Sequence, residues 1–308
     1  MIKLSFYKTG EYIIICPMIN YDEPLYRPPS EANSLIIQAT LGCSHNRCTF
    51  CEMYKSKSYI EREIEDVEAE IESMSSYGKI RRVFIADGDA MALPADKLLR
   101  ILIKLNTTFP SLQRVSIYAN PGNLLKKTPE ELKSLSEAGL TLLYLGIESG
   151  SDLILKKINK GALFSHQKEA IIKAMANGID VSATIITGLG GKEFWHEHIE
   201  ESARLVSEAA PTFLSTLSLM ISPLTSEPFI SAFENGFEQQ TDAGMLEEEK
   251  LLISLIDPPR KIIFRSNHAS NALALRGTLP GDREKLVEKI DSALSGEIAV
   301  RPEWMRGL

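Results

Sequence analysis

The sequence predicts an α/β fold, a partial (β/α)6 TIM-like barrel with an extension at each end. Two observations carry this prediction: short β-rich runs alternate with longer segments of helical periodicity, and six such strands follow one another along the chain. The chain has 308 residues, 44% of them hydrophobic, which is enough for one large domain with a substantial core. We expect an N-terminal extension over residues 1–33, the partial barrel over 34–222, and a C-terminal extension over 223–308 that closes the barrel.

The expected strands are short runs rich in β-branched and aromatic residues. They cover residues 36–40, 82–86, 115–119, 142–146, 181–186 and 213–220. A further apolar run at 261–264 indicates a seventh strand. Longer amphipathic segments separate these runs, as in repeated βα units around a parallel sheet.

The expected helices have apolar residues three or four positions apart and recognisable ends. They cover residues 61–75, 94–105, 128–138, 166–176, 194–209 and 281–294. Thr128 and Pro129 form an N-cap and a first-turn proline, and Gly139 and Gly178 follow the ends of two helices. Residues 225–260 are acidic and more irregular.

The overall charge argues against a protein that binds duplex nucleic acid. The chain contains 34 basic and 41 acidic residues, a formal net charge of −7, and no long basic run. A local RNA contact is still compatible with this composition. Residues 1–8 lack the apolar core of a signal peptide, and no apolar stretch reaches about 18 residues, the length that indicates a membrane span. We therefore expect a cytoplasmic protein.

Three of the four cysteines lie close together, directly after the first expected strand. Cys43, Cys48 and Cys51 have the spacing C-x4-C-x2-C, whereas Cys16 stands alone and is expected to be a small buried apolar residue. Such a local group of cysteines in a reducing compartment indicates a metal site rather than a disulfide framework.

Spacing alone leaves three kinds of metal site open. A plant-type two-iron ferredoxin begins with this spacing but needs a fourth cysteine, and no cysteine follows Cys51. A zinc site would use His45 as its fourth ligand, although this residue lies only two positions after Cys43. A four-iron cluster held by three cysteines would leave one iron free to bind a small chelating ligand.

Polar or glycine-rich segments follow five successive expected strands. They are residues 43–51, 87–89, 120–123, 148–151 and 187–191. The carboxyl ends of parallel strands gather at one rim, where α/β proteins collect their functional loops. Residues 187–191 lack the Lys-Ser/Thr ending of a nucleotide-binding loop, so we expect their glycines to allow close approach to a bound ligand.

The cysteine loop and the rim that follows it resemble the radical SAM enzymes, over about residues 34–222. In that family three cysteines after the first barrel strand hold a [4Fe–4S] cluster, whose free iron binds S-adenosylmethionine (SAM). The usual family spacing is C-x3-C-x2-C, so this chain has one additional residue. The whole chain also resembles an uncharacterised group of radical SAM proteins that share residues 27–31, 265–271 and 301–304.

The resemblance implies a function. A cluster on the three loop cysteines would receive one electron and reductively cleave SAM to methionine and a 5′-deoxyadenosyl radical, which would abstract hydrogen from an unknown organic substrate. A flavodoxin- or ferredoxin-like electron donor would meet the protein near this loop. His45, Arg47 and Tyr54 flank the loop, and at least one is expected to tune or shield the cluster.

The resemblance also implies which residues lie along the adenine of SAM. They are Phe50, just before the last cysteine, Ile186 at the end of the fifth strand, and Met220 at the end of the sixth. Thr184 replaces the first glycine of the family's G-x-I-x-G stretch around Ile186.

The polar end of SAM is expected at two other strand exits. By the same resemblance, Gly88 and Asp89 would receive the methionyl ammonium group, which a carboxylate suits. Glu148 and Ser149 would contact the ribose hydroxyls or the amino acid end. The structural alternatives are a turn role for Asp89 and, for Glu148, a position beside the N-cap of the following helix, with Ser149 or Ser151 as the cap itself.

The residues expected to act on the substrate lie after the seventh strand. They are Arg265, Asn267, His268 and Asn271, four polar side chains that an apolar strand would deliver to the open face of the barrel. The alternative is a hydrogen-bonded loop that closes the barrel or packs against the C-terminal helix.

Two other functions stay open on the sequence. One is a non-catalytic iron–sulfur or zinc protein that binds a partner or senses redox state. The other is a haem or cluster chaperone, similar to the porphyrin-linked branches of the family, in which His45 or His268 would be the axial ligand. His196 and His198 are two positions apart on one expected helix and diverge, so they are not expected to share a metal ion.

Overall fold

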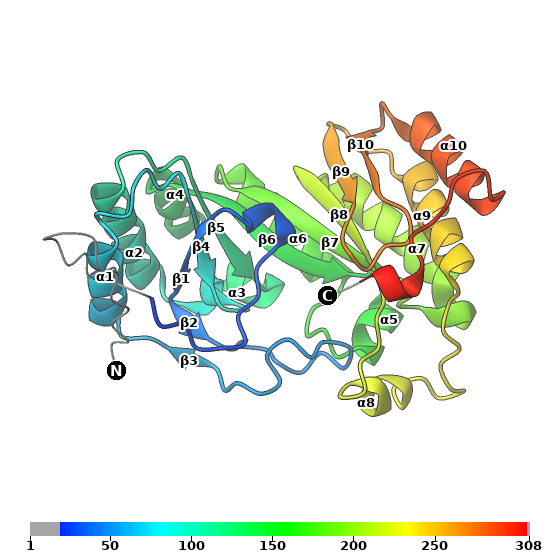
Figure 1. Ribbon diagram of the computed structural model, residues 1–308, viewed down its shortest axis with the longest axis horizontal. Helices are drawn as coiled ribbons and strands as arrows, with labels where there is room; N and C mark the ends of the chain where they lie inside the picture. Colours follow the sequence, from blue (N-terminus) through cyan, green and yellow to red (C-terminus); the bar gives the residue numbers. More distant parts are fainter. Residues whose placement is uncertain (1–18, 307–308) are drawn as a thin grey trace, which may run out of the picture.

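A computed structural model describes residues 19–306, so Cys16 lies outside the described residues. Its centre is one sheet with the strand order β1-β4-β5-β6-β7-β8-β9-β10 (Figure 1). The strands are β1 Leu35–Gln38, β4 Arg82–Ala86, β5 Arg114–Ala119, β6 Leu140–Glu148, β7 Asp180–Thr187, β8 Phe213–Ser218, β9 Ile262–Ser266 and β10 Leu275–Leu279. Neighbours from β1 to β9 are parallel, and β10 is antiparallel to β9. A separate small sheet pairs β2 (Thr40–Leu41) with β3 (Ile60–Glu61).

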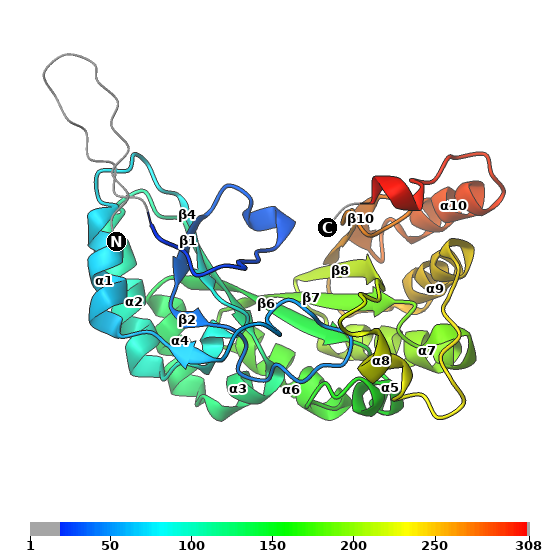
Figure 2. The ribbon, with the colours of Figure 1, turned by 60° about the horizontal axis from the view of Figure 1, so that its bottom comes forward.

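Helices cover one face of the sheet, which we call the outer face. Figure 2 shows α3, α4, α6 and α7 below the strands, α1 and α2 beside the β1 end, and α9 and α10 beside the β10 end. The α-helices are α1 Ile64–Ser73, α2 Ala95–Thr108, α3 Pro121–Lys126, α4 Pro129–Glu137, α5 Asp152–Lys157, α6 Phe164–Ala176, α7 Gly191–Ala209, α8 Ser226–Ile230, α9 Asp242–Leu255 and α10 Arg283–Leu294. Three 3-10 turns are η1 Pro29–Glu31, η2 Ala90–Ala92 and η3 Glu303–Met305. The main apolar core lies between the sheet and the helices. Within residues 19–306 no helix is long and apolar enough to cross a membrane.

The opposite face of the sheet, the inner face, carries the alternate side chains of the same strands. At the β1 end it is aromatic: Phe84, Tyr118 and Tyr144 meet edge to face, with ring centroids 5.0 to 6.1 Å apart. Tyr21 and Leu25, from the segment before β1, pack against this cluster. Figure 2 shows that segment, in blue, on the side of the sheet opposite the helices.

The predicted α/β fold with a mainly parallel sheet is confirmed, and the sheet is open, because among the described strands no pairing joins β10 back to β1. The expected strands correspond to β1, β4, β5, β6, β7, β8 and β9. The sixth of them ends at Ser218, so Met220 lies beyond the strand. The sequence prediction lacks β10, whose central Gly277 makes this short segment resemble a turn.

The segment 225–260 is more regular than expected, because it contains the 14-residue helix α9. Glu248 and Glu249 are both buried on this helix, and two buried carboxyl groups interrupt the apolar repeat that identifies a helix from sequence. Burial raises the pKa of each to about 7. Glu248 accepts a hydrogen bond from the Gly188 amide (2.6 Å) and Glu249 from the Thr216 hydroxyl (2.6 Å), which fixes α9 to the ends of β7 and β8.

Candidate active site

Both ends of the cysteine loop form hydrogen bonds to one buried carboxylate, that of Asp87, which directly follows β4. Asp87 accepts hydrogen bonds from Gln38 Nε2 and the Gly42 amide, each at 3.0 Å, and from Lys57 Nζ at 3.1 Å. Gly42 has a φ of 70°, and a Cβ there would lie 2.9 Å from the Ser58 carbonyl oxygen, so glycine is needed at this point. The segments that enter the loop at Gly42 and leave it at Lys57 are therefore held together by Asp87.

Asn46 accommodates the longer interval between the first two cysteines. Its φ is 41°, a left-handed conformation that asparagine tolerates better than most residues. Its side-chain amide donates to the carbonyl oxygens of Tyr54 (2.8 Å) and Lys57 (3.2 Å) on the returning limb. The interval C-x4-C thus contains a turn that is braced across the loop, a role the sequence does not reveal.

The far side of the loop is joined to the turn after α5. The Thr49 amide donates to the Ile158 carbonyl oxygen at 2.9 Å, and Asn159 Nδ2 donates to the Arg47 carbonyl oxygen at 3.2 Å. His45 Nε2 lies 2.7 Å from the Asn159 carbonyl oxygen. His45 is engaged with this turn, and within residues 19–306 no three His, Cys, Asp or Glu side chains group around a single-ion position.

Cys48 and Cys51 lie near a buried ion pair that the sequence does not predict. Burial raises the pKa of Cys48 and raises that of Cys51 to about 11. Lys160 Nζ lies 2.9 Å from Glu148 Oε1, and both side chains are only 10% exposed. Burial alone would lower the pKa of Lys160, but the Glu148 carboxylate and the nearby Cys48 and Cys51 raise it overall, so the ammonium form is retained. Lys160 is therefore a fixed positive charge next to two of the cysteines.

Glu148 owes its position to backbone geometry at the end of β6. Its φ is 61°, and the pairing of β6 with β7 shifts register between Gly146 and Glu148. A Cβ at Gly146 would lie 2.1 Å from Glu148 Oε1 and 3.3 Å from Lys160 Nζ. Both charged groups therefore lie over Gly146 on the inner face of the sheet.

Asp89 connects three of the strand exits. It is fully buried and accepts hydrogen bonds from the Ser44 hydroxyl, from Asn123 Nδ2 (2.6 Å) and from the Asn120 amide (3.1 Å). Burial raises the pKa of its carboxyl group. Gly88 beside it has no room for a side chain, since a Cβ would lie 2.6 Å from the Tyr54 ring and 3.1 Å from Cys43 Cβ.

A buried histidine joins two other expected site residues. His198 of α7 is fully buried, with Nδ1 2.8 Å from the Ser149 hydroxyl and Nε2 2.9 Å from the Ile186 carbonyl oxygen. Burial lowers its pKa to about 4, so the ring is neutral near pH 7. The ring then donates from Nε2 to Ile186 and accepts from Ser149 at Nδ1. The sequence placed His198 on a helix but did not identify this bridge.

Phe50 and Ile186 share an apolar cluster. Ile186 is buried in it with Leu189 and Leu219, and Phe50 packs against its edge. Met220 is 43% exposed and lies outside the cluster's buried residues. The structure therefore brings two of the three expected adenine contacts together and leaves the third at the surface.

The four expected substrate residues differ in their surroundings. Asn271 is buried and bonds to the end of β8, accepting from the Ser218 amide (2.7 Å) and donating to the Thr216 carbonyl oxygen (2.8 Å). His268 is half-buried, with Nδ1 2.9 Å from the Ser270 hydroxyl. Arg265 and Asn267 are exposed. Asn271 thus matches the hydrogen-bonded alternative for this segment, whereas Arg265 extends from β9 at the inner face.

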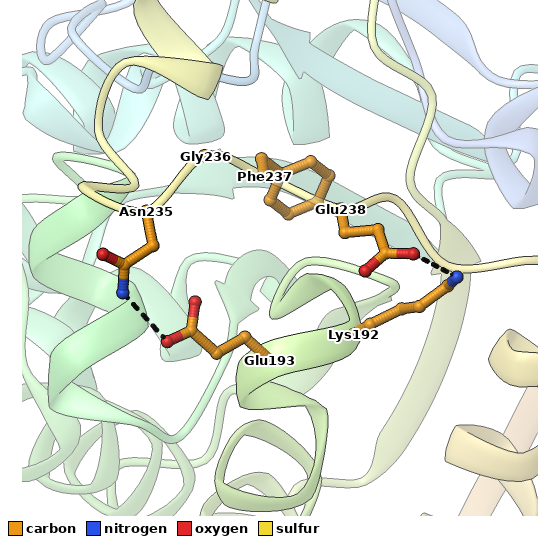
Figure 3. Close-up of a pocket in the computed structure, with 6 residues that line it drawn as sticks. All are labelled: Lys192, Glu193, Asn235, Gly236, Phe237 and Glu238. Atoms are coloured by element: carbon orange, nitrogen blue, oxygen red, sulfur yellow. Dashed lines mark hydrogen bonds and ion pairs between the residues drawn. The ribbon is translucent and has the colours of Figure 1, made fainter.

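A hollow of about 410 Å³ lies at the start of α7, away from the cysteines in sequence (Figure 3). It is lined by Lys192, Glu193, Asn235, Gly236, Phe237 and Glu238. Lys192 pairs with Glu238, and Asn235 Nδ2 donates to Glu193 Oε1 at 3.4 Å. None of the expected site residues lines this hollow, and its polar groups are already paired with one another.

The cysteine loop suits an iron–sulfur group with a polar ligand. Its three thiols are soft donors of the kind that bind such clusters. The Thr49 and Tyr59 hydroxyls in the same loop are buried without a hydrogen-bond partner among residues 19–306, and buried polar atoms of this kind ordinarily have one. The residues present therefore fit a cluster together with a further polar molecule.

Comparison with known proteins decides the family. A model of the Radical SAM superfamily matches residues 37–206, which is more than half of the chain. The chain belongs to the radical SAM superfamily. Enzymes of this superfamily use a [4Fe–4S] cluster and SAM, so the iron–sulfur alternative replaces the zinc and two-iron ones. The match supports radical SAM catalysis.

The curated relatives of this radical SAM protein differ in function from one another. It is 27% identical over 229 residues to the tRNA-2-methylthio-N(6)-dimethylallyladenosine synthase of Alkalilimnicola ehrlichii, covering 70% of this chain and 49% of that protein. It is 25% identical over 192 residues to the heme chaperone HemW of Bacillus subtilis, covering 59% and 49%. The chain spans about half the length of these curated relatives. A solved structure of the radical SAM methyltransferase TsrM from Kitasatospora setae, with cobalamin and a [4Fe–4S] cluster, has a TM-score of 0.53 at 16% identity, over 84% of this chain and 61% of that one, which supports the fold alone.

Proposed function

We propose that this protein binds a [4Fe–4S] cluster through Cys43, Cys48 and Cys51 and reductively cleaves SAM to act on an organic substrate. The observation that carries the proposal is the cysteine loop itself: its base is held by Asp87, its tip is joined to residues 158–159, and the buried Lys160 lies beside its thiols. A rigid loop with a fixed cation next to it is suited to an anionic metal centre.

When bound, the cluster and SAM together supply an electron and a 5′-deoxyadenosyl radical that abstracts hydrogen from the substrate. The chain's own residues bind and orient these groups. Lys160 offsets the negative charge of the cluster and its thiolates, because a positive charge nearby favours thiolate over thiol. Glu148 holds Lys160 in place, and the burial of both residues limits contact with water.

SAM is assigned to the rim between the loop and the ends of β6 and β7. In this proposal the Gly88 backbone and the negative charge of Asp89 receive the methionyl ammonium group, and Glu148 and Ser149 face the ribose or amino acid end. The close packing of Gly88 on Tyr54 and Cys43 supports a position beside the cluster. The adenine would lie along Phe50 and Ile186, which already pack in one apolar cluster, with Met220 at its exposed border.

The electron is proposed to come from a flavodoxin- or ferredoxin-like donor that docks at the cysteine loop. The partial exposure of the three cysteines supports this approach, because electron transfer needs the donor close to the cluster. Arg47 and Lys55 are available on the loop surface for a donor of opposite charge.

Replacing any one of the three loop cysteines with alanine is expected to abolish cluster assembly. The wild-type protein, reconstituted anaerobically with iron and sulfide, should contain about four irons and four sulfides per chain, and SAM should alter the electron paramagnetic resonance spectrum of the reduced cluster. Iron and sulfide analysis of Cys43→Ala, Cys48→Ala and Cys51→Ala should show their loss.

Cys16→Ala and His45→Gln are the matched controls. Cys16 lies outside the loop in sequence, and His45 is bonded to Asn159, so both variants should keep the cluster. A wild-type protein that is isolated with zinc and no sulfide, or a Cys48→Ala variant that retains a full cluster, would contradict the proposal.

A further inference from the structure

Two arginines face each other on the inner face of the sheet, at the end opposite the aromatic cluster. Arg265 of β9 and Arg276 of β10 are direct partners in the antiparallel register, and both are exposed. Directly opposed residues on antiparallel strands project from the same face of the sheet, with Cβ atoms about 4.5–5.5 Å apart. The two positive charges are therefore held close together by the backbone rather than by chance side-chain positions.

This arrangement has no compensating negative charge. Like charges directly opposite each other destabilise a sheet. Within residues 19–306 neither Arg265 nor Arg276 forms an ion pair with a carboxylate, and the Arg265 guanidinium donates only to the Phe264 carbonyl oxygen at 2.7 Å. Several other arginines have carboxylate partners, namely Arg62, Arg100, Arg114, Arg204, Arg283 and Arg306. Arg81 and Arg82 have none among the described residues either, but they follow one another along the chain and are not cross-strand partners. In a chain with a net charge of −7, two adjacent arginines without carboxylate partners are suited to bind an anion from solution.

The arginine pair is connected to the proposed SAM site by one row of side chains. In the sheet register Gly146 is opposite Thr184, Thr184 is opposite Ser215, and Ser215 is opposite Arg265. The Glu148–Lys160 pair lies over Gly146 at the other end of this row. Neighbouring strands are about 4.8 Å apart, so three strand spacings place Arg265 about 15 Å from Gly146.

The row between these ends is small and polar. The Thr184 and Ser215 hydroxyls form no hydrogen bonds within the described part of the chain, and both residues are partly exposed. The Thr184 and Ser215 side chains are small, and their hydroxyls offer hydrogen-bond donors and acceptors along the sheet between the Glu148–Lys160 pair and the two arginines. An elongated molecule can therefore lie across β6 to β10 on the inner face.

We infer that this row binds the organic substrate, with Arg265 and Arg276 holding a carboxylate or phosphate group of it. The planar guanidinium groups match both oxyanions by paired N–H···O bonds. The inference rests on the proposed function in taking the Glu148–Lys160 end of the row as the reacting end. A polynucleotide fits less well, since it would need a longer basic track than two arginines.

An anion titration of the full-length protein tests this site without any turnover. Sodium phosphate and sodium glutarate are added at low ionic strength, with sodium chloride at matched ionic strength, and the unfolding temperature is followed. At least one of the two oxyanions should raise it in a saturable way that chloride does not reproduce. Whether phosphate or glutarate binds more tightly distinguishes a phosphate from a carboxylate ligand.

The double variant Arg265→Gln/Arg276→Gln should bind that anion at least tenfold more weakly. In anion-free buffer it should unfold at the wild-type temperature or above, because the repulsion is removed; a merely structural role would lower it. Arg81→Gln/Arg82→Gln, which removes the same charge from exposed positions at the start of β4, should bind the anion like wild type.

Equal responses of the wild type and the Arg265→Gln/Arg276→Gln variant would overturn the inference, as would oxyanion responses no larger than that of chloride. Binding of a short oligoribonucleotide that is 100-fold tighter than either anion, and lost in the variant, would overturn it in favour of nucleic acid. Because the titration needs no SAM, it decides this inference even if the wild type fails to cleave SAM, which would refute the proposed function separately.

Discussion

Replacing Lys160 with methionine is expected to reduce release of 5′-deoxyadenosine from SAM by about 100-fold or more, equivalent to about 3 kcal/mol of activation free energy. The variant removes the buried cation beside Cys48 and Cys51 and leaves Glu148 as an unpaired buried carboxylate. Breaking a buried ion pair in this way costs about 3–5 kcal/mol, so the free energy of unfolding should fall by a similar amount. Single-turnover assays and chemical denaturation measure the two effects.

The double variant Glu148→Gln/Lys160→Met separates stability from function. Removing both charges should restore most of the free energy of unfolding, because no unpaired charge is left buried. Release of 5′-deoxyadenosine should stay low, because the positive charge next to the thiolates is still absent. Recovery of both properties together would show that Lys160 acts only on folding.

Replacing His198 with leucine is expected to lower the free energy of unfolding at pH 7 by about 1–3 kcal/mol. The change leaves the buried Ser149 hydroxyl without its acceptor and the Ile186 carbonyl oxygen without its donor. Both residues belong to the proposed SAM site, so the dissociation constant for SAM should also rise. Denaturant titration and SAM binding to the reconstituted protein measure these effects.

The pH dependence of this difference identifies the histidine. Burial lowers the folded pKa of His198 to about 4 from 6.5, so its stabilising contribution is fully present above pH 6.5 and is lost as the pH falls toward 4. A shift of this size is worth about 3 kcal/mol. The gap between wild type and variant should therefore shrink over this range.

The difference in free energy of unfolding between wild type and variant must be measured, not the wild-type curve alone, because buried carboxyl groups, Asp89 among them, act in the opposite sense. Glu248 and Glu249 have folded pKa values raised by burial to about 7, so their contribution grows as the pH falls from 7 to 4.5. They are present in both proteins and cancel in the difference. A gap that is constant between pH 7 and pH 4.5 would contradict a buried neutral His198.

Local patterns account for what the sequence predicted. The strands are compact apolar runs, and the three cysteines are close along the chain, so their spacing alone indicates a metal loop. The position of polar segments after successive strands then places them at one rim, because parallel strands end together. Phe50 and Ile186 come from separate exits of this rim and do pack in one cluster.

What the sequence could not predict depends on contacts between distant residues. Lys160 reaches Glu148 and the cysteines only through the turn after α5, and nothing in its local sequence distinguishes it from a surface lysine. Helix α9 escaped prediction because Glu248 and Glu249 are buried where apolar residues are expected. The Arg265–Arg276 pair depends on the register of β10, a strand that the sequence does not reveal.

The role of Asn46 also depends on contacts that the sequence does not show. A left-handed residue with two side-chain hydrogen bonds to the returning limb explains how the loop tolerates four residues between its first two cysteines. From the sequence, the interval between Cys43 and Cys48 is only one residue longer than the family pattern. In the folded loop, it forms a turn that the Asn46 side chain stabilises.

The products formed from SAM show whether this protein carries out radical SAM chemistry. The anaerobically reconstituted protein, with about four irons per chain and dithionite as reductant, should convert SAM to equal amounts of methionine and 5′-deoxyadenosine, and Cys48→Ala treated in the same way should form neither. Absence of 5′-deoxyadenosine from wild-type protein that holds an intact, reducible four-iron cluster would contradict the account.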